Sequence, residues 1–142
     1  MTKKPLIRVL LLLPGYPATP AWIEPSLKGL ESAISIGADD PCKPASKKLT
    51  NRIWILWNSE ANFLVFRPNR KIGKSILFGA ACIVETDENA RPVSMSEKQF
   101  AYWHAMFAYP EVFTDIEIID AQFEENQTTE WRWPVATISF FL

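Results

Sequence analysis

The sequence feature that most constrains the fold is a pair of apolar runs that flank a short polar stretch near the middle of the chain. Residues 53–57 are β-branched, aromatic or aliphatic, residues 58–62 favour turns, and residues 63–66 resume the apolar run. This order predicts a β-hairpin with a loop of about four or five residues. Because neither arm alternates between apolar and polar residues, we expect strands covered on both faces, or strands that leave Trp54 or Trp57 for a partner.

Two further apolar runs have the length of buried strands. Residues 6–13 are apolar apart from Arg8 and stop at a Pro-Gly pair, and residues 75–85 form a second run. Residues 39–50 are polar and contain two prolines and three lysines, so we expect a loop there. The strands are therefore expected on both sides of the central hairpin.

Two segments carry helical signals. Residues 25–36 place aliphatic side chains at helical spacing, and the run from Ser96 to Gln99 is a capping box that opens a second helix. In that box the serine accepts from the Gln99 amide and the glutamine side chain reaches back. The sequence predicts one α+β domain over residues 1–142, with an antiparallel or mixed sheet of about five to seven strands and two helices packed on one face.

The N-terminus and the cysteines predict a cytoplasmic protein without a membrane segment. Lysines precede an apolar run, as in a signal peptide, but Arg8 interrupts it and leaves only residues 9–13, which is shorter than a signal core. Cys42 and Cys82 lie far apart and form no CxxC pattern, which predicts reduced structural thiols.

Residues that commonly carry catalysis are scarce. His104 is the single histidine, and we expect it in the core or at its rim because no nucleophile pattern lies near it. The sequence has no GxSxG, no HExxH and no phosphate-binding glycine loop. Asp39-Asp40 has no further ligands at metal-loop spacing. We therefore expect a protein that acts by binding, with no cofactor and no metal.

The charges divide the chain into a basic middle and an acidic end. Between Lys43 and Lys74 eight cations stand against Glu60 alone, whereas from Ser75 onward eleven acidic residues face three cations. Residues 111–142 hold seven of these acids and two tryptophans. We expect them to form a hairpin, with a strand over 114–123, a turn at 124–129 and a returning strand that Pro134 places at a sheet edge.

The order of signals over about residues 1–110 resembles a family of unknown function that is common in bacteriophages and mobile elements. The matching pieces are short motifs: Pro14-Gly15, the helix with Leu27 and Leu30, Asn58-Ser59-Glu60, Pro68-Asn69-Arg70, Gly79, and the helix from Ser96 to Met106-Phe107. The resemblance implies a small α+β domain of a phage or mobile element and brings no activity with it. Loop 39–50 and tail 111–142 depart from the pattern.

Three functional hypotheses follow. The first is an anti-defence inhibitor or adaptor that docks on a host nucleic-acid-handling protein, such as a defence nuclease complex, through the acidic tail. Its contact residues would be Trp131, Trp133, Glu117, Asp120, Glu124 and Glu125. The second is a nucleic-acid-binding or anion-binding accessory protein that uses Arg67, Asn69, Arg70, Lys71, Lys74 and Trp57. The third is a small-ligand or enzymatic site near the turn at Pro68 to Arg70. A monomer or a homodimer in the host cytoplasm fits all three.

Overall fold

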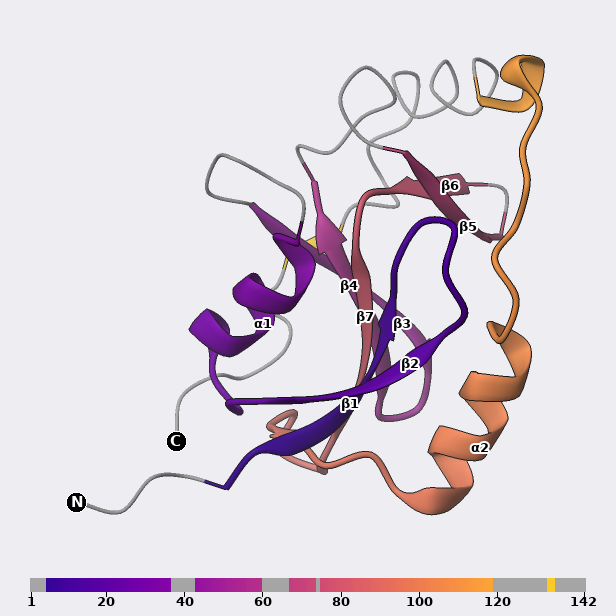
Figure 1. The fold of residues 1–142 in the computed structure, drawn as a ribbon. Coiled ribbons are helices and arrows are strands. Elements are labelled where there is room, and N and C mark those ends of the chain that lie inside the picture. Colours follow the sequence, from indigo (N-terminus) through magenta and orange to yellow (C-terminus); the bar gives the residue numbers. More distant parts are fainter. Residues whose placement is uncertain (1–4, 37–42, 60–66, 74, 119–132, 135–142) are drawn as a thin grey trace.

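The computed structural model describes residues 5–36, 43–59, 67–73, 75–118 and 133–134, and it shows an α+β fold built on one main sheet (Figure 1). The strands of this sheet run in the order β2-β1-β7-β4-β3-β9, and β8 also pairs with β7. They comprise β1 (Ile7–Leu12), β2 (Thr19–Ile23), β3 (Pro44–Thr50), β4 (Ile53–Asn58), β7 (Ala81–Thr86), β8 (Pro92–Val93) and β9 (Trp133–Pro134). All strand pairings among the described residues are antiparallel.

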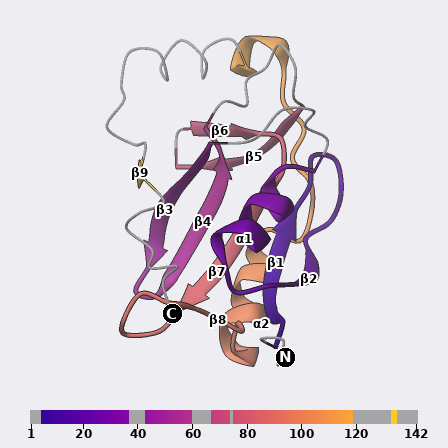
Figure 2. The ribbon, with the colours of Figure 1, turned by 90° about the vertical axis from the view of Figure 1, so that its left-hand side faces the viewer.

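A two-stranded ribbon and two helices complete the fold. The ribbon consists of β5 (Pro68–Ile72) and β6 (Ser75–Phe78) and lies across one end of the main sheet (Figures 1 and 2). The helices are α1 (Leu27–Ile34) and α2 (Glu97–Met106), which begin after the capping serines Ser26 and Ser96. The α+β class and the antiparallel sheet predicted from the sequence are confirmed.

The two helices lie on opposite faces of the sheet, so the prediction that both pack on one face is wrong. Leu30 and Ile34 of α1 pack with one set of buried strand residues, whereas Trp103 of α2 packs with another. All six residues of β4 are buried, as are five of the six in β7. Central strands without a polar face need cover on both sides, and each helix supplies one cover.

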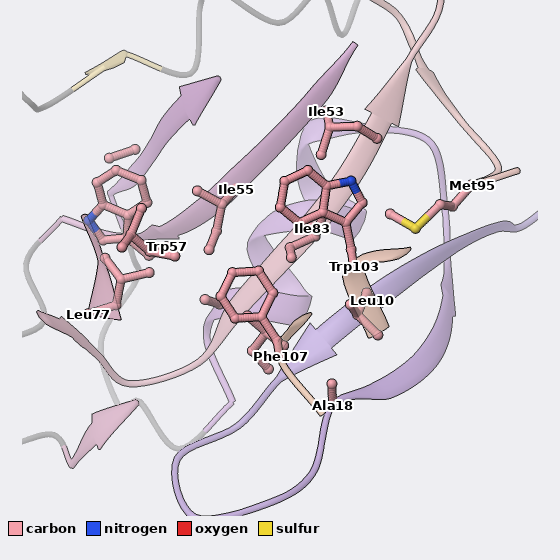
Figure 3. Packing of buried hydrophobic residues seen from close by; sticks show 14 residues of the cluster. Leu10, Ala18, Ile53, Ile55, Trp57, Leu77, Ile83, Met95, Trp103 and Phe107 are labelled. Carbon is pink, nitrogen blue, oxygen red and sulfur yellow. The ribbon is translucent and has the colours of Figure 1, made fainter. Parts of the chain in front are cut away.

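The core on the α2 side is the larger cluster. Trp103 and Phe107 lie over Leu10 and Ile83 of the sheet, while Trp57 and Leu77 pack together towards the β5–β6 ribbon (Figure 3). The ribbon thus closes one end of this cluster. Burial of so many large side chains supplies most of the stabilisation of a domain of this size.

The central hairpin is made with the preceding segment rather than the following one. β4 pairs with β3 through a tight turn at Asn51 and Arg52, and its other edge pairs with β7. The loop predicted over residues 39–50 is therefore wrong for 44–50, because Ala45 and Ser46 are buried in the sheet and proline is tolerated as a first strand residue. The second arm expected at 63–66 lies outside the described residues.

The capping box at the start of α2 is half formed. The Ser96 hydroxyl accepts from the Gln99 N–H, as predicted, but the Gln99 side chain instead accepts a hydrogen bond from the Trp103 indole over 3.1 Å. The Glu85 carboxylate accepts from the Ser96 N–H over 3.0 Å and so takes the place of the glutamine. This contact ties the first turn of α2 to β7.

The described start of the acidic tail is helical, so the strand predicted from residue 114 is wrong over residues 115–118. The Thr114 hydroxyl accepts from the Glu117 N–H, and the Glu117 carboxylate accepts from the Thr114 N–H. This is a Thr-x-x-Glu capping box, which stabilises a helical turn against an extended strand.

Among the described residues no helix is long and apolar enough to cross a membrane.

Candidate functional site

All three tyrosines of the chain are exposed: Tyr102 lies on α2, Tyr109 on the segment that follows it, and Tyr16 in the loop after β1. Tyr16 is 62% exposed, Tyr102 55% and Tyr109 85%. Large apolar side chains accompany them: Met106 on α2, and Val112 and Ile116 on the segment that follows it. We call the set Tyr16, Tyr102, Met106, Tyr109, Val112 and Ile116 the tyrosine face.

Two chain segments distant in sequence meet at this face. The Ala18 N–H donates to the Ala108 carbonyl over 3.3 Å, so the loop after β1 runs beside the segment after α2. On α2, Tyr102 and Met106 are one turn apart, which places them on the same side of the helix. Trp103 and Phe107 turn to the core, so Tyr102 and Met106 lie on the outer side of a helix whose inner side is anchored.

The buried side chain of Arg70 links the loop after β1 to the segment after α2. Its guanidinium donates to the carbonyls of Phe107 and Tyr16 and of Leu13, and to the Asn69 side-chain oxygen, over 2.7 to 3.3 Å. These bonds use all of its donors. Arg70 is only 1% exposed, and this desolvation lowers its pKa while the negative charge of Glu111 raises it. An arginine still stays protonated at any physiological pH.

Asn69 extends the same network into the sheet. Its amide group donates to the Leu12 carbonyl over 2.8 Å and to the Gly79 carbonyl over 2.7 Å. Asn69 thus links β5 to the end of β1 and to the turn before β7. The pair Asn69-Arg70 fixes where the segments bearing Tyr16 and Tyr109 leave the core, because a satisfied polar network in a buried setting is rigid.

Lys71 holds the segment after α2 at a second point. Its ammonium donates to the Glu117 carboxylate over 3.1 Å and lies 6.0 Å from the ring centre of Phe113. Its backbone N–H donates to Glu111 over 3.4 Å. The hydrogen bond from Lys71, followed by those from Thr114, lowers the pKa of Glu117, which is therefore ionised at neutral pH.

The segment that carries Val112 and Ile116 is itself acidic, although Lys71 of β5 pairs with its Glu117. Glu111 and Asp115 are exposed on the segment that carries Val112 and Ile116, and residues 105–118 contain no lysine or arginine. Exposed apolar area bordered by carboxylates is typical of a protein-binding surface with a basic partner.

The residues predicted for an anion or nucleic-acid site do not form one surface. Trp57, Asn69 and Arg70 are buried. Arg67 and Lys71 are exposed, and Lys74 lies outside the described residues. The turn expected at Pro68 to Arg70 is instead part of strand β5, which points its central polar side chains into the protein.

The residues predicted for the acidic docking site are mostly beyond the described part. Asp120, Glu124, Glu125 and Trp131 lie outside the described residues, and Trp133 is described only as backbone in β9. Glu117 is described and forms an ion pair with Lys71, so an acid of residues 111–142 pairs with a cation of residues 43–74. β9 pairs Pro134 with Ala45 and ends the described sheet, as predicted for an edge strand.

The tyrosine face was not predicted from the sequence, although α2 carries a signal for it. The predicted face of this helix was the inner one, with Trp103 and Phe107, whereas Tyr102 and Met106 lie on the opposite side. Two large apolar residues on the outer side of a capped helix are the kind of signal that marks a contact surface.

The remaining reactive groups are placed for structure. Cys82 is fully buried, and desolvation raises the pKa of its thiol to about 12, so the thiol stays protonated. His104 is partly buried and stacks on Phe100 with ring centres 5.5 Å apart. No group of three or more metal-ligating side chains gathers within the described ranges.

No protein-family model, curated protein or solved structure matches this chain. The resemblance to a phage family thus stays a prediction.

Proposed function

We propose that this protein acts by binding a basic surface of another protein, with the tyrosine face as its main contact. The observation that carries the proposal is the exposure of all three tyrosines together with Val112, which is 96% exposed. A monomeric protein has little reason to leave so many large apolar side chains in water on α2 and on the segments that adjoin it. Tyrosine is also among the residues that contribute most to protein interfaces, because its ring is large and has few rotatable bonds.

The support beneath the face favours a rigid docking element. Arg70 and Lys71 hold the segment after α2 at its start, at Phe107, and near its end, at Glu117. A surface held in this way loses little conformational entropy on binding, which raises affinity for a given contact area.

The acidic border defines the class of partner. Glu111 and Asp115 would attract a positively charged surface and speed its association. Proteins that handle nucleic acids present such surfaces. Together with the predicted phage or mobile-element origin, this supports an anti-defence inhibitor or adaptor that acts in the host cytoplasm, with Trp131 and Trp133 as additional anchors.

The test compares two double variants of the full chain in affinity purification from host lysate, followed by titration of the purified partner. Tyr109→Ala with Val112→Ala should weaken binding at least about tenfold, since interface aromatics are often worth more than 1.4 kcal/mol. Trp131→Ala with Trp133→Ala measures the contribution of the tail. Leu27→Ala is the control, because Leu27 is an exposed apolar residue on α1, on the opposite face of the sheet.

The result shows whether the tyrosine face is the surface that contacts the partner. A basic partner that is lost with the tyrosine-face variant but kept with Leu27→Ala supports the proposal. If no partner is retained by wild type, or if the tyrosine-face variant binds as wild type does, the tyrosine face is not the contact surface.

A further inference from the structure

A cleft of about 230 Å³ lies between two tight turns. Both turns are at the end of the sheet away from the β5–β6 ribbon (Figures 1 and 2). One turn joins β3 to β4 through Asn51 and Arg52, and the other joins β7 to β8. The Thr86 N–H donates to the Arg52 carbonyl over 2.8 Å, which fixes the turns side by side. Neither turn takes part in the tyrosine face.

The cleft has charges of both signs. Lys48 and Arg52 line it from the β3–β4 side, and Asp87 and Glu88 line it from the β7–β8 side. The lining is therefore neutral as a whole but divided into a positive and a negative part. A ligand with both charges, suitably spaced, would match this division better than a simple ion.

Hydrogen bonds fix the Asp87 carboxylate and the Thr86 hydroxyl of the cleft in place. The N–H groups of Arg91 and Asn89 donate to the Asp87 carboxylate over 3.0 and 2.8 Å. These hydrogen bonds, the one from Arg91 first, lower the pKa of Asp87 and keep it ionised. The Trp54 indole beneath donates to the Thr86 hydroxyl over 3.2 Å, and the Lys48 ammonium lies 5.9 Å from the Trp54 ring centre.

The backbone at this cleft is strained on both sides. Arg52 has φ 67° and Ala90 has φ 62°, and they are the two non-glycine residues with left-handed backbone among those described. Tight hairpin turns usually place glycine or asparagine at such positions, because a Cβ makes the conformation unfavourable. Backbone strain that a protein retains is concentrated at functional sites.

We propose that this cleft binds a small zwitterion, a molecule that carries a carboxylate and an ammonium group a few bonds apart, as a free α-amino acid does. Lys48 and Arg52 bind the carboxylate, and Asp87 and Glu88 bind the ammonium group. A ligand with one charge pairs with half of the lining and leaves the other half facing it with like charge, so it binds more weakly.

The test is an NMR titration of the isotope-labelled full chain with glycine, and in parallel with acetate and with methylammonium, which are its two charged halves. Glycine should shift the amide signals of residues 51–52 and 87–90 to saturation. Each half should bind at least about fivefold more weakly, the effect of one exposed charge pair. No saturable shift with glycine, or equal shifts with either half, would overturn the proposal.

Charge-removing variants locate the binding. Lys48→Gln and Glu88→Gln should each weaken glycine binding about fivefold, whereas Lys98→Gln, an exposed lysine on α2, should leave it unchanged. Arg52→Gly removes a cation and relieves the left-handed backbone, so it should weaken glycine binding while the melting temperature holds or rises. If all four variants bind glycine alike, the ligand does not occupy this cleft.

Discussion

Replacement of Arg70 by methionine should destabilise the protein although it removes a buried charge. The guanidinium donates five hydrogen bonds. The Phe107 carbonyl and the Asn69 side-chain oxygen lie in buried surroundings, whereas the Leu13 and Tyr16 carbonyls are partly buried and water can reach them. Methionine keeps much of the volume and supplies no donor.

The expected loss follows from the two buried acceptors. Each one left without a donor costs about 1–3 kcal/mol, or about 2–6 kcal/mol for both. Relief from desolvating the guanidinium offsets part of this. We expect the free energy of unfolding to fall by about 3 kcal/mol, so a domain with the typical stability of roughly 5–15 kcal/mol stays folded.

The measurement is equilibrium unfolding in urea followed by tryptophan fluorescence, since Trp54, Trp57 and Trp103 are buried and report on the core. Arg67→Met is the matched control, because Arg67 is an exposed arginine next to the same strand and should cost no more than about 0.5 kcal/mol. Arg70→Lys retains the charge without the forked donor geometry and should fall between the two. Equal stability of Arg70→Met and Arg67→Met would refute the role assigned to Arg70.

Three further outcomes are expected. Because the pKa of Glu117 is lowered in the folded state, the Glu117 carboxylate stabilises the protein fully above the ordinary carboxylate pKa range, and this stabilisation is lost as the pH falls through the folded-state pKa. An NMR titration that follows residues 115–118 should show the loss. Glu117→Gln should remove the pH dependence. Gly29→Ala should destabilise despite the better helix propensity of alanine, because a Cβ at residue 29 would overlap the Glu24 carbonyl; thermal unfolding that showed stabilisation would contradict this. Cys82, with a thiol pKa of about 12, should resist thiol reagents at pH 8 until the chain unfolds, as a labelling time course would reveal.

The apolar runs predicted which segments form buried strands, because an apolar segment is buried whichever strand it pairs with. The runs at 6–13 and 53–57 contain the interior strands β1 and β4. The run at 75–85, expected as one buried strand, is instead divided at Gly79 between β6 of the ribbon and β7 of the main sheet. Their partners were harder to predict. Residues 44–50 pair with β4 although they are largely polar, because only Ala45 and Ser46 among them are buried and backbone hydrogen bonds to β4 hold the rest.

The role of the basic residues 43–74 could not be predicted from their charge alone, because an arginine or lysine can either contact a partner at the surface or donate hydrogen bonds inside the protein. Asn69 and Arg70 are adjacent and both buried, which no simple alternation along a strand would predict. Their role depends on carbonyl groups of Leu12, Leu13 and Phe107, which are far away in sequence.

This use of Arg70 also bears on which surface can act. A cation committed to carbonyl groups inside the protein is withdrawn from phosphate contacts, and with Trp57 buried the hypothesis of a nucleic-acid surface at residues 67–74 loses its central residues. The same bonds position the segments that carry Tyr16 and Tyr109. If the tyrosine face binds a partner, Arg70→Lys should therefore weaken that binding in the folded protein, without any change to an exposed residue.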